Sequence, residues 1–284
     1  MASRHTLARE VLVQGVTLHS GLPSRLRLLP AAPGTGIVFQ RADLKGSAPI
    51  PALWSNVAET RLGTVLRGPD GATVGVIEHL MSALSGAEID DCAIDVEGPE
   101  PPILDGDALS FLVAIDEAGT RAQGTRQAIR LNRPVDIGSA SASVKLLPAE
   151  RPEFTFEIEF PTAVIGRQEF SCVLDRDTFR REIAPARTFG FLKEAEQLRA
   201  AGFGRGADLS NTLVIDGDTL MNALLQRYKD EFVRHKILDA VGDLKLAGLP
   251  IIARFEGRKS SHSLNNQLLR ALFADPANYR IGPA

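Results

Sequence analysis

The chain contains 284 residues, of which 44% are hydrophobic and 24% are charged, and its formal net charge is -3. This composition excludes disordered and fibrous classes of protein, and the near-neutral charge excludes the strongly basic surface that draws proteins to nucleic acid, so we expect no nucleic-acid partner. At about 150 residues per domain, the length predicts two domains, each large enough to bury its own core.

Apolar runs and cysteines bear on where the protein works. No stretch approaches the roughly 20 consecutive apolar residues that a membrane-spanning helix needs, so we expect no span. Cys92 and Cys172 lie 80 positions apart. Two cysteines are too few for a disulfide framework or a thiolate zinc site, so we expect reduced thiols. The sequence therefore predicts a cytoplasmic protein without a membrane anchor.

The first half of the chain alternates strand-like and helix-like segments. Residues 24–31 and 36–43 have the pattern of strands and are bounded by Gly, Pro and Asn. Apolar residues recur at helical spacing in 74–86, where a glycine ends the run. A strand is expected at 91–98, and a second amphipathic helix at 108–119.

A polar segment, 120–127, separates the two halves and is the best candidate for a linker. Beyond it strands come first again, and in 154–160 Phe and Ile alternate with Thr and Glu, which predicts a half-buried antiparallel strand. The later elements that we expect are a helix at 191–202, one helix or two between about 218 and 247, a strand at 249–257 and a helix at 263–274.

The two halves share a faint internal repeat. In each, a helix that carries a histidine precedes a strand that ends in Glu-Gly, 18 residues after His79 and 21 residues after His235. We therefore predict an α+β fold of two similar sandwich domains, 1–122 and 123–284, each a mainly antiparallel sheet with helices on one face. If the helix layers pack together, His79 and His235 face each other around the active site.

A His-Asp pair in the second half has the spacing of a metal site. His235 and Asp239 stand four residues apart in a helical segment, so their side chains lie one turn apart on the same face, and Asp243 continues the stripe. The alternative is a surface ion pair. The flanking residues are apolar, and carboxylates buried in such surroundings need partners.

Glu78 and His79 are adjacent in the apolar helix of the first half. Adjacent helical residues diverge by about 100°, so the two cannot ligate one ion comfortably. His79 can instead bind a metal while Glu78 faces the water beside it. The alternative is a hydrogen-bonded core histidine next to a solvent-facing glutamate.

Two histidines and one aspartate make a three-ligand set with an open position, the pattern of a catalytic zinc site. Such an ion lowers the pKa of bound water, a nearby Glu can take the proton, and a His is a reasonable donor to the leaving group. His262 is available for that role, although its segment also has the pattern of a helix start capped by Ser261 or Ser263. His19 and His5 have no assigned role.

Several segments together resemble one family. They are TLHSG (17–21), VIEHLMSAL (76–84), EPPILDGDA (100–108), ARTFGFLKE (186–194), SNTLVI (210–215), FVRHKILDAVGDLKLAG (232–248) and KSSHSLNNQLLR (259–270). In this order they closely resemble the UDP-3-O-acyl-N-acetylglucosamine deacetylases, the zinc amidases of lipid A biosynthesis in Gram-negative bacteria. The resemblance spans nearly the whole chain and implies two similar α+β domains with the active site between their helix layers.

The resemblance also assigns a metal and a substrate. It implies that His79, His235 and Asp239 bind Zn²⁺, with Fe²⁺ as an alternative metal, and that Glu78 is the general base. The substrate implied is UDP-3-O-acyl-N-acetylglucosamine, which loses its N-acetyl group as acetate in the committed step of lipid A biosynthesis. The segment at about 190–215 corresponds to the family's passage for the acyl chain. We expect a monomer.

Five further roles follow from the same resemblance. His262 acts as an imidazolium that stabilises the oxyanion and assists departure of the amine, and Asp243 orients it. Thr188 matches a hydroxyl that helps to stabilise the tetrahedral intermediate. Phe189 matches a ring at the sugar and passage mouth, and Lys236 matches a cation at the substrate.

The sequence departs from the family pattern at three positions. Ser261 and Thr17 stand where Gly is usual, and Asp107 stands where a small Ser is common. None is a proposed ligand, so we expect these departures to affect fine substrate preference more than the reaction.

Two other classes of function remain open from the residues alone. An Fe(II) oxygenase uses the same two-His-one-carboxylate set, but it gives no reason for Glu78 and His262. A nucleotide-sugar or acyl-chain binding module would keep normal ligand binding after changes to these residues and would release no acetate.

Overall fold

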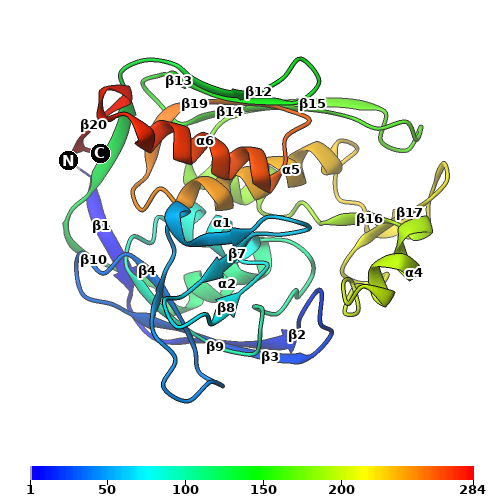
Figure 1. The fold of residues 1–284 in the computed structure, drawn as a ribbon, viewed down its shortest axis with the longest axis horizontal. Helices are drawn as coiled ribbons and strands as arrows, with labels where there is room; N and C mark the ends of the chain where they lie inside the picture. The colour runs from blue at the N-terminus through cyan, green and yellow to red at the C-terminus, as the bar shows by residue number, and fades with distance from the viewer. Residues whose placement is uncertain (1) are drawn as a thin grey trace.

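Two sheets enclose two layers of helices in the computed structural model, which describes residues 2–284 (Figure 1). The sheet of the first half lies on one side and that of the second half on the other, and the helices of both halves meet between them. This arrangement confirms the predicted α+β class, with antiparallel pairing dominant in both sheets.

The first-half sheet has the strand order β2-β3-β9-β4-β5. In β3, Ser24, Leu26 and Leu28 are buried and alternate with more exposed residues, which is why this segment forms a strand with one face in the core. The strands are β2 (Val11–Val16), β3 (Pro23–Pro30), β9 (Cys92–Glu97), β4 (Ile37–Arg41) and β5 (Ile50–Pro51). Helices α1 (Glu78–Gly86) and α2 (Leu109–Ala118) cover its inner face.

The second-half sheet has the order β12-β13-β19-β11-β20, with β14 joining β19 to β15. Phe154, Phe156 and Ile158 of β14 point into the core, as their alternation predicts. Helices α5 (Glu231–Lys245) and α6 (His262–Ala274) lie against this sheet. The strands are β11 (Gln127–Leu131), β12 (Val135–Gly138), β13 (Ser143–Pro148), β14 (Glu153–Glu159), β15 (Arg167–Val173), β19 (Ile251–Arg258) and β20 (Tyr279–Pro283).

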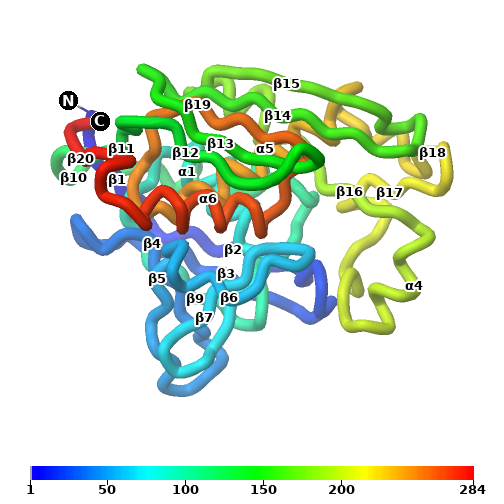
Figure 2. Tube along the Cα trace, turned by 45° about the horizontal axis from the view of Figure 1, so that its top comes forward, coloured from blue at the N-terminus to red at the C-terminus, as the bar shows by residue number. Residues whose placement is uncertain are grey.

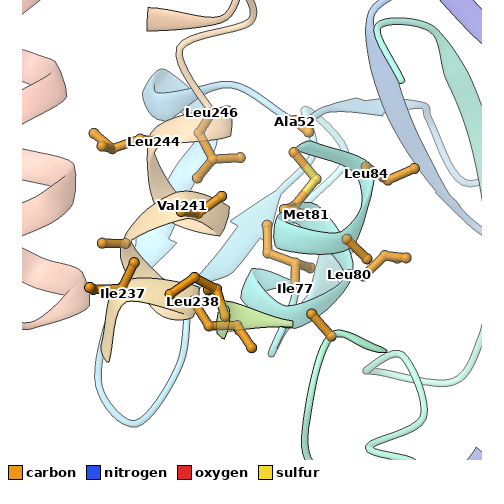
Figure 3. Packing of buried hydrophobic residues seen from close by; sticks show 14 of the residues in the cluster. Ala52, Ile77, Leu80, Met81, Leu84, Ile237, Leu238, Val241, Leu244 and Leu246 are labelled. Carbon is orange, nitrogen blue, oxygen red and sulfur yellow. The ribbon is translucent and has the colours of Figure 1, made fainter. Parts of the chain in front are cut away.

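The core between the halves is formed mainly by α1 and α5. Figure 3 shows apolar side chains of the two helices packed against one another. Ile77 and Met81 from α1 and its N-cap face Leu238 and Val241 of α5, whereas Leu80 and Leu84 point to the far side of α1 and Ile237 and Leu244 to the far side of α5; all eight are buried. Burial of apolar surface stabilises by roughly 25 cal/mol per Å², so this contact helps to hold the two histidine-bearing helices together.

Smaller elements surround the two sandwiches. A three-stranded sheet of β16, β17 and β18 carries α4 and projects from one end of the molecule (Figures 1 and 2). The projecting unit consists of β16 (Phe189–Phe191), α4 (Leu192–Ala200), β17 (Leu213–Asp216) and β18 (Thr219–Leu220). The other small elements are β1 (Ser3–Leu7), β6 (Val57–Glu59), β7 (Val65–Arg67), β8 (Thr73–Val74), β10 (Thr120–Thr125) and α3 (Arg176–Thr178). Short helical turns span Trp54–Asn56, Phe179–Ile183, Ala223–Leu225 and Pro276–Asn278.

Two sequence predictions were wrong in detail. The predicted linker, 120–127, contains strand β10, which pairs with β1 in an antiparallel ribbon. Its side chains are mostly exposed, so the segment lacks the apolar alternation that identifies a strand. The helix expected between about 218 and 247 begins only at Glu231, because the residues before it form β18 and a short turn.

The boundary predicted between residues 122 and 123 falls inside β10, and the division into two domains at that point stays a prediction. None of the helices within residues 2–284 combines the length and the apolar character needed to cross a membrane.

Candidate metal centre

His79, His235 and Asp239 converge in the contact between α1 and α5. Their candidate ligand atoms all lie within 4.8 Å of one another, and all three residues are buried. Asp239 Oδ1 is 3.4 Å from His235 Nε2 and 3.7 Å from His79 Nε2. Two atoms that each bind one zinc ion at about 2.1 Å with tetrahedral geometry lie roughly 3.4 Å apart. The spacing therefore fits a single ion.

The protonation states of this group also fit a metal. Burial, reinforced by His235, lowers the pKa of His79 to about 3, and burial lowers the pKa of His235 as well. Burial opposes ionisation of Asp239, but Lys236 and the nearby histidines hold its pKa far below the usual range. Two neutral imidazoles and one carboxylate are the forms that bind a divalent cation.

Neighbouring groups orient two of the three candidate ligands. His235 Nδ1 donates to the carbonyl of Ala186 at 3.0 Å, which fixes the tautomer with a free lone pair on Nε2. Lys236 donates to Asp239 Oδ2 at 2.6 Å, so Oδ1 is the oxygen left facing the histidines. His79 Nδ1 is buried and has no hydrogen-bond partner among residues 2–284.

Glu78 lies beside the three candidate ligands at the start of α1. Its side chain is buried, and burial is the main cause that raises its pKa to about 7, although the charge of His262 opposes the shift. Its Oε1 is 3.9 Å from His262 Nε2. A carboxylate with a pKa near neutrality is suited to accept a proton in this pH range.

His262, at the start of α6, is held by Asp243 of α5. Its Nδ1 donates to Asp243 Oδ2 at 2.8 Å. Burial opposes the charged form of His262, but Asp243 and Glu78 together raise its pKa to about 9. A pKa of about 9 favours the imidazolium form of the ring at neutral pH, and its Nε2 lies 3.9 Å from Glu78 Oε1.

The remaining predicted residues are Phe189, Thr188 and Lys236. The Phe189 ring is 6.3 Å from the His235 ring, centre to centre, and packs edge-on against Phe232. Thr188 directly precedes it and is fixed by its backbone, since its N–H donates to the Gly106 carbonyl at 2.8 Å. Lys236 is ion-paired with Asp239, so its predicted contact with substrate stays a prediction.

Sequence reasoning missed two side chains that support Asp243. Thr64 Oγ1 donates to Asp243 Oδ1 at 2.6 Å, and Asn265 Nδ2 donates to Asp243 Oδ2 at 2.8 Å. Asn265 stands three residues after His262 on the same helix, and that spacing is a usable signal. Thr64 comes from a distant loop, and no pattern in the sequence connects it with Asp243.

The three departures from the family pattern lie in well-satisfied local structure. Ser261 is the N-cap of α6 and accepts from the Leu264 N–H at 3.4 Å, so its segment is both a capped helix start and the carrier of His262. Thr17 bonds with Ser20 in a turn. Asp107 is buried, accepts from Ser110 and is ion-paired with Arg227.

Of the two unassigned histidines, His19 ties loops together. Its Nε2 donates to the Leu62 carbonyl at 2.7 Å, and its Nδ1 accepts from the Gly204 N–H at 3.3 Å. It therefore joins the loop before β7 to the projecting unit that carries α4. His5 contributes its backbone to the contact between β1 and Asp90.

Comparison with known proteins shows the family to which the chain belongs. The family model for UDP-3-O-acyl N-acetylglycosamine deacetylases matches residues 4–274. Relatives named UDP-3-O-acyl-N-acetylglucosamine deacetylase from Brucella melitensis biotype 2, Brucella ovis and Brucella abortus strain S19 are each 45% identical over 282 residues, which cover 99% of this chain and 98% of the relative. The chain belongs to the UDP-3-O-acyl-N-acetylglucosamine deacetylase family.

Proposed function

We propose that the chain is a metal-dependent deacetylase of lipid A biosynthesis. It hydrolyses the N-acetyl amide of UDP-3-O-acyl-N-acetylglucosamine to acetate and a free amine. The observation that carries this proposal is the convergence of three buried ligands with Glu78 and His262 beside them. A metal site alone would also fit an Fe(II) oxygenase, but only a hydrolase uses a base at the position of Glu78 and an acid at the position of His262.

His79, His235 and Asp239 would hold the metal, and we propose Zn²⁺, with Fe²⁺ as the alternative. When bound, the ion would supply Lewis-acid chemistry, polarising the amide carbonyl and lowering the pKa of water. Glu78 takes the proton from the attacking water as the new C–O bond forms. Its buried position and its pKa near 7 suit that step.

His262 completes the reaction on the leaving-group side. Its Nε2–H faces the same space as Glu78 Oε1 and donates its proton to the amine nitrogen as the C–N bond breaks. Asp243 keeps the ring oriented through Nδ1 and stabilises its charge. Thr188 and the imidazolium of His262 stabilise the negative oxygen of the tetrahedral intermediate.

Analogy with the family supports a proposal for the rest of the substrate. Phe189 packs beside the sugar, Lys236 contacts the polar head, and the projecting unit at about 190–215 takes the acyl chain. Phe160, Phe189 and Phe191 form an aromatic cluster at the base of that unit, which supplies an apolar wall. We propose that the enzyme works as a monomer in the cytoplasm.

Acetate release from UDP-3-O-acyl-N-acetylglucosamine tests this function. We expect equal amounts of acetate and free amine, loss of turnover with a chelator and recovery with added zinc. A requirement for oxygen and a co-substrate would instead indicate an oxygenase, and binding without any acetate would indicate a binding module.

A further inference from the structure

Thr64 contacts both carboxylates that govern proton transfer in the site. It lies in the loop just before β7 and is 1% exposed. Its backbone N–H donates to Glu78 Oε2 at 3.0 Å, and its hydroxyl donates to Asp243 Oδ1 at 2.6 Å. One residue of the first half therefore joins the general base on α1 to the carboxylate on α5 that orients His262.

The hydroxyl completes the hydrogen bonding of Asp243. Oδ2 of this carboxylate already accepts from His262 Nδ1 and from Asn265 Nδ2, each at 2.8 Å. Within residues 2–284, Thr64 is the residue whose side chain donates a hydrogen bond to Oδ1. Without it, a carboxylate that is 2% exposed keeps one oxygen without a donor and gains freedom to rotate about its last bond.

Rotation of Asp243 would move the proton donor. The His262 ring takes its orientation from the bond between Nδ1 and Asp243, and this bond directs Nε2 toward Glu78 Oε1 at 3.9 Å. At the other end, the Thr64 N–H occupies Glu78 Oε2 and leaves Oε1 free on the side of His262. The separation of base and acid is thus set from one residue.

The loop that carries Thr64 is itself fixed. Leu62 and Gly63 adopt positive φ angles of 61° and 149°, and the Leu62 carbonyl accepts from His19 Nε2 at 2.7 Å. Positive φ is uncommon for a residue other than glycine and persists only where surrounding contacts hold it. The anchor is therefore firm enough to position two other side chains.

We propose that Thr64 is a positioning residue for the deacetylation, fixing the relative placement of Glu78 and His262 through its two hydrogen bonds. This inference rests on the proposed function, since it concerns the same acid and base. It predicts that the hydroxyl matters for turnover and that it matters only through Asp243.

Thr64→Val and Thr64→Ser form the matched pair that tests it. Valine keeps the side-chain volume and the N–H bond to Glu78 but removes the hydroxyl, whereas serine keeps both bonds. We expect Thr64→Val to lower kcat by about 10- to 100-fold, the range for outer partners of such sites, with KM changed by less than about threefold and zinc content unchanged. Thr64→Ser should retain most of the wild-type kcat.

A double-mutant cycle with Asp243→Asn tests the route of the effect. If Thr64 acts through Asp243, Thr64→Val should cause little further loss of kcat in the Asp243→Asn background. Any of three results would overturn the inference. They are full additivity of the two losses of kcat, a wild-type kcat in Thr64→Val, and a kcat in Thr64→Ser as low as that of Thr64→Val. Thr64→Ala serves the same comparison if the valine variant does not fold.

A readout apart from activity separates this inference from the proposed function. The Nδ1–H proton signal of His262 in NMR spectra should persist in wild type and Thr64→Ser and should exchange faster with water in Thr64→Val. An inactive wild type with this pattern would refute the function and keep the positioning role. An active wild type with the same signal in all three proteins would refute the positioning role alone.

Discussion

Gly242 of α5 lies directly against the backbone carbonyl of Glu78 on α1. A Cβ atom at Gly242 would come within 2.0 Å of that oxygen. The two helices that carry the proposed ligands therefore approach each other closely only because this position has no side chain. The contact fixes the distance between His79 on one helix and the His235-Asp239 pair on the other.

Gly242→Ala should therefore destabilise the protein. Alanine favours a helix interior over glycine by about 1 kcal/mol, but the clash with a backbone atom forces the helices apart and typically costs about 1–3 kcal/mol net. We expect lower unfolding free energy in denaturant titrations and weaker zinc binding. Gly282→Ala is the control, because a Cβ there meets no atom within 4 Å. Equal stability of the two variants would contradict the close-contact argument.

Metal removal should lower stability through the same three residues. A ligand that binds only the folded state at 1,000 times its Kd stabilises that state by about 4 kcal/mol, so chelation should lower Tm measurably. His235→Ala should lack this response, since it removes one of the converging ligands. His5→Ala is the matched control, because His5 lies outside the site, and it should respond to chelation like the wild type. A wild-type Tm that ignores chelator and zinc would argue against a metal held by folded residues.

Replacing Glu78 by Gln separates catalysis from metal binding. The amide cannot accept a proton, so we expect turnover to fall by about 10²- to 10⁴-fold, the range for lost acid-base catalysis. Metal content should stay stoichiometric, because the three ligands are unchanged. Glu10→Gln, at a glutamate paired with Arg27 on the surface, should keep normal turnover. Near-normal acetate release by Glu78→Gln would show that the base is another residue.

Lys245 gives a pH dependence of stability. It ends α5, donates to the Ile89 carbonyl at 2.7 Å, and burial lowers its pKa from 10.5 to about 8. Between these pH values the unfolded chain binds this proton and the folded chain does not, so stability rises with pH. The gain is on the order of 3 kcal/mol by pH ~10.5 and is absent below pH ~8.

The comparison with Lys245→Met isolates this group from all others that titrate. The unfolding free energy of the wild type, minus that of Lys245→Met, should be constant below about pH 8 and should increase up to about pH 10.5. A difference that stays flat over this range would mean that Lys245 keeps an ordinary pKa in the folded protein.

Much of the fold follows from periodicity. The alternation in 154–160 and the helical spacing after Ile77 correspond to β14 and α1, because each element buries one face. The sequence did not predict β10, because the side chains of this strand are mostly exposed and its pairing with β1 is through the backbone. The spacing of His235 and Asp239 indicated a shared face, whereas their approach to His79 depends on how two helices far apart in sequence pack together.

The supporting residues of the site show where sequence patterns end. Asn265 shares a helix face with His262, and helical spacing can reveal such a relationship. Thr64 and the Ala186 carbonyl reach the site from loops, and the tertiary fold alone brings them to Asp243 and His235. Roles that depend on a backbone carbonyl leave no trace in side-chain identity.

The most direct test is a titration of the metal-free protein with zinc in which acetate release is measured after each addition. It tests the claim that residues of both halves form one metal-dependent deacetylase centre. We expect no turnover without metal, a rise in proportion to added zinc and a break at about one equivalent, and we expect His79→Ala and His235→Ala each to fail to reach this level. Full turnover in the chelated protein, or an unchanged titration in either variant, would contradict it.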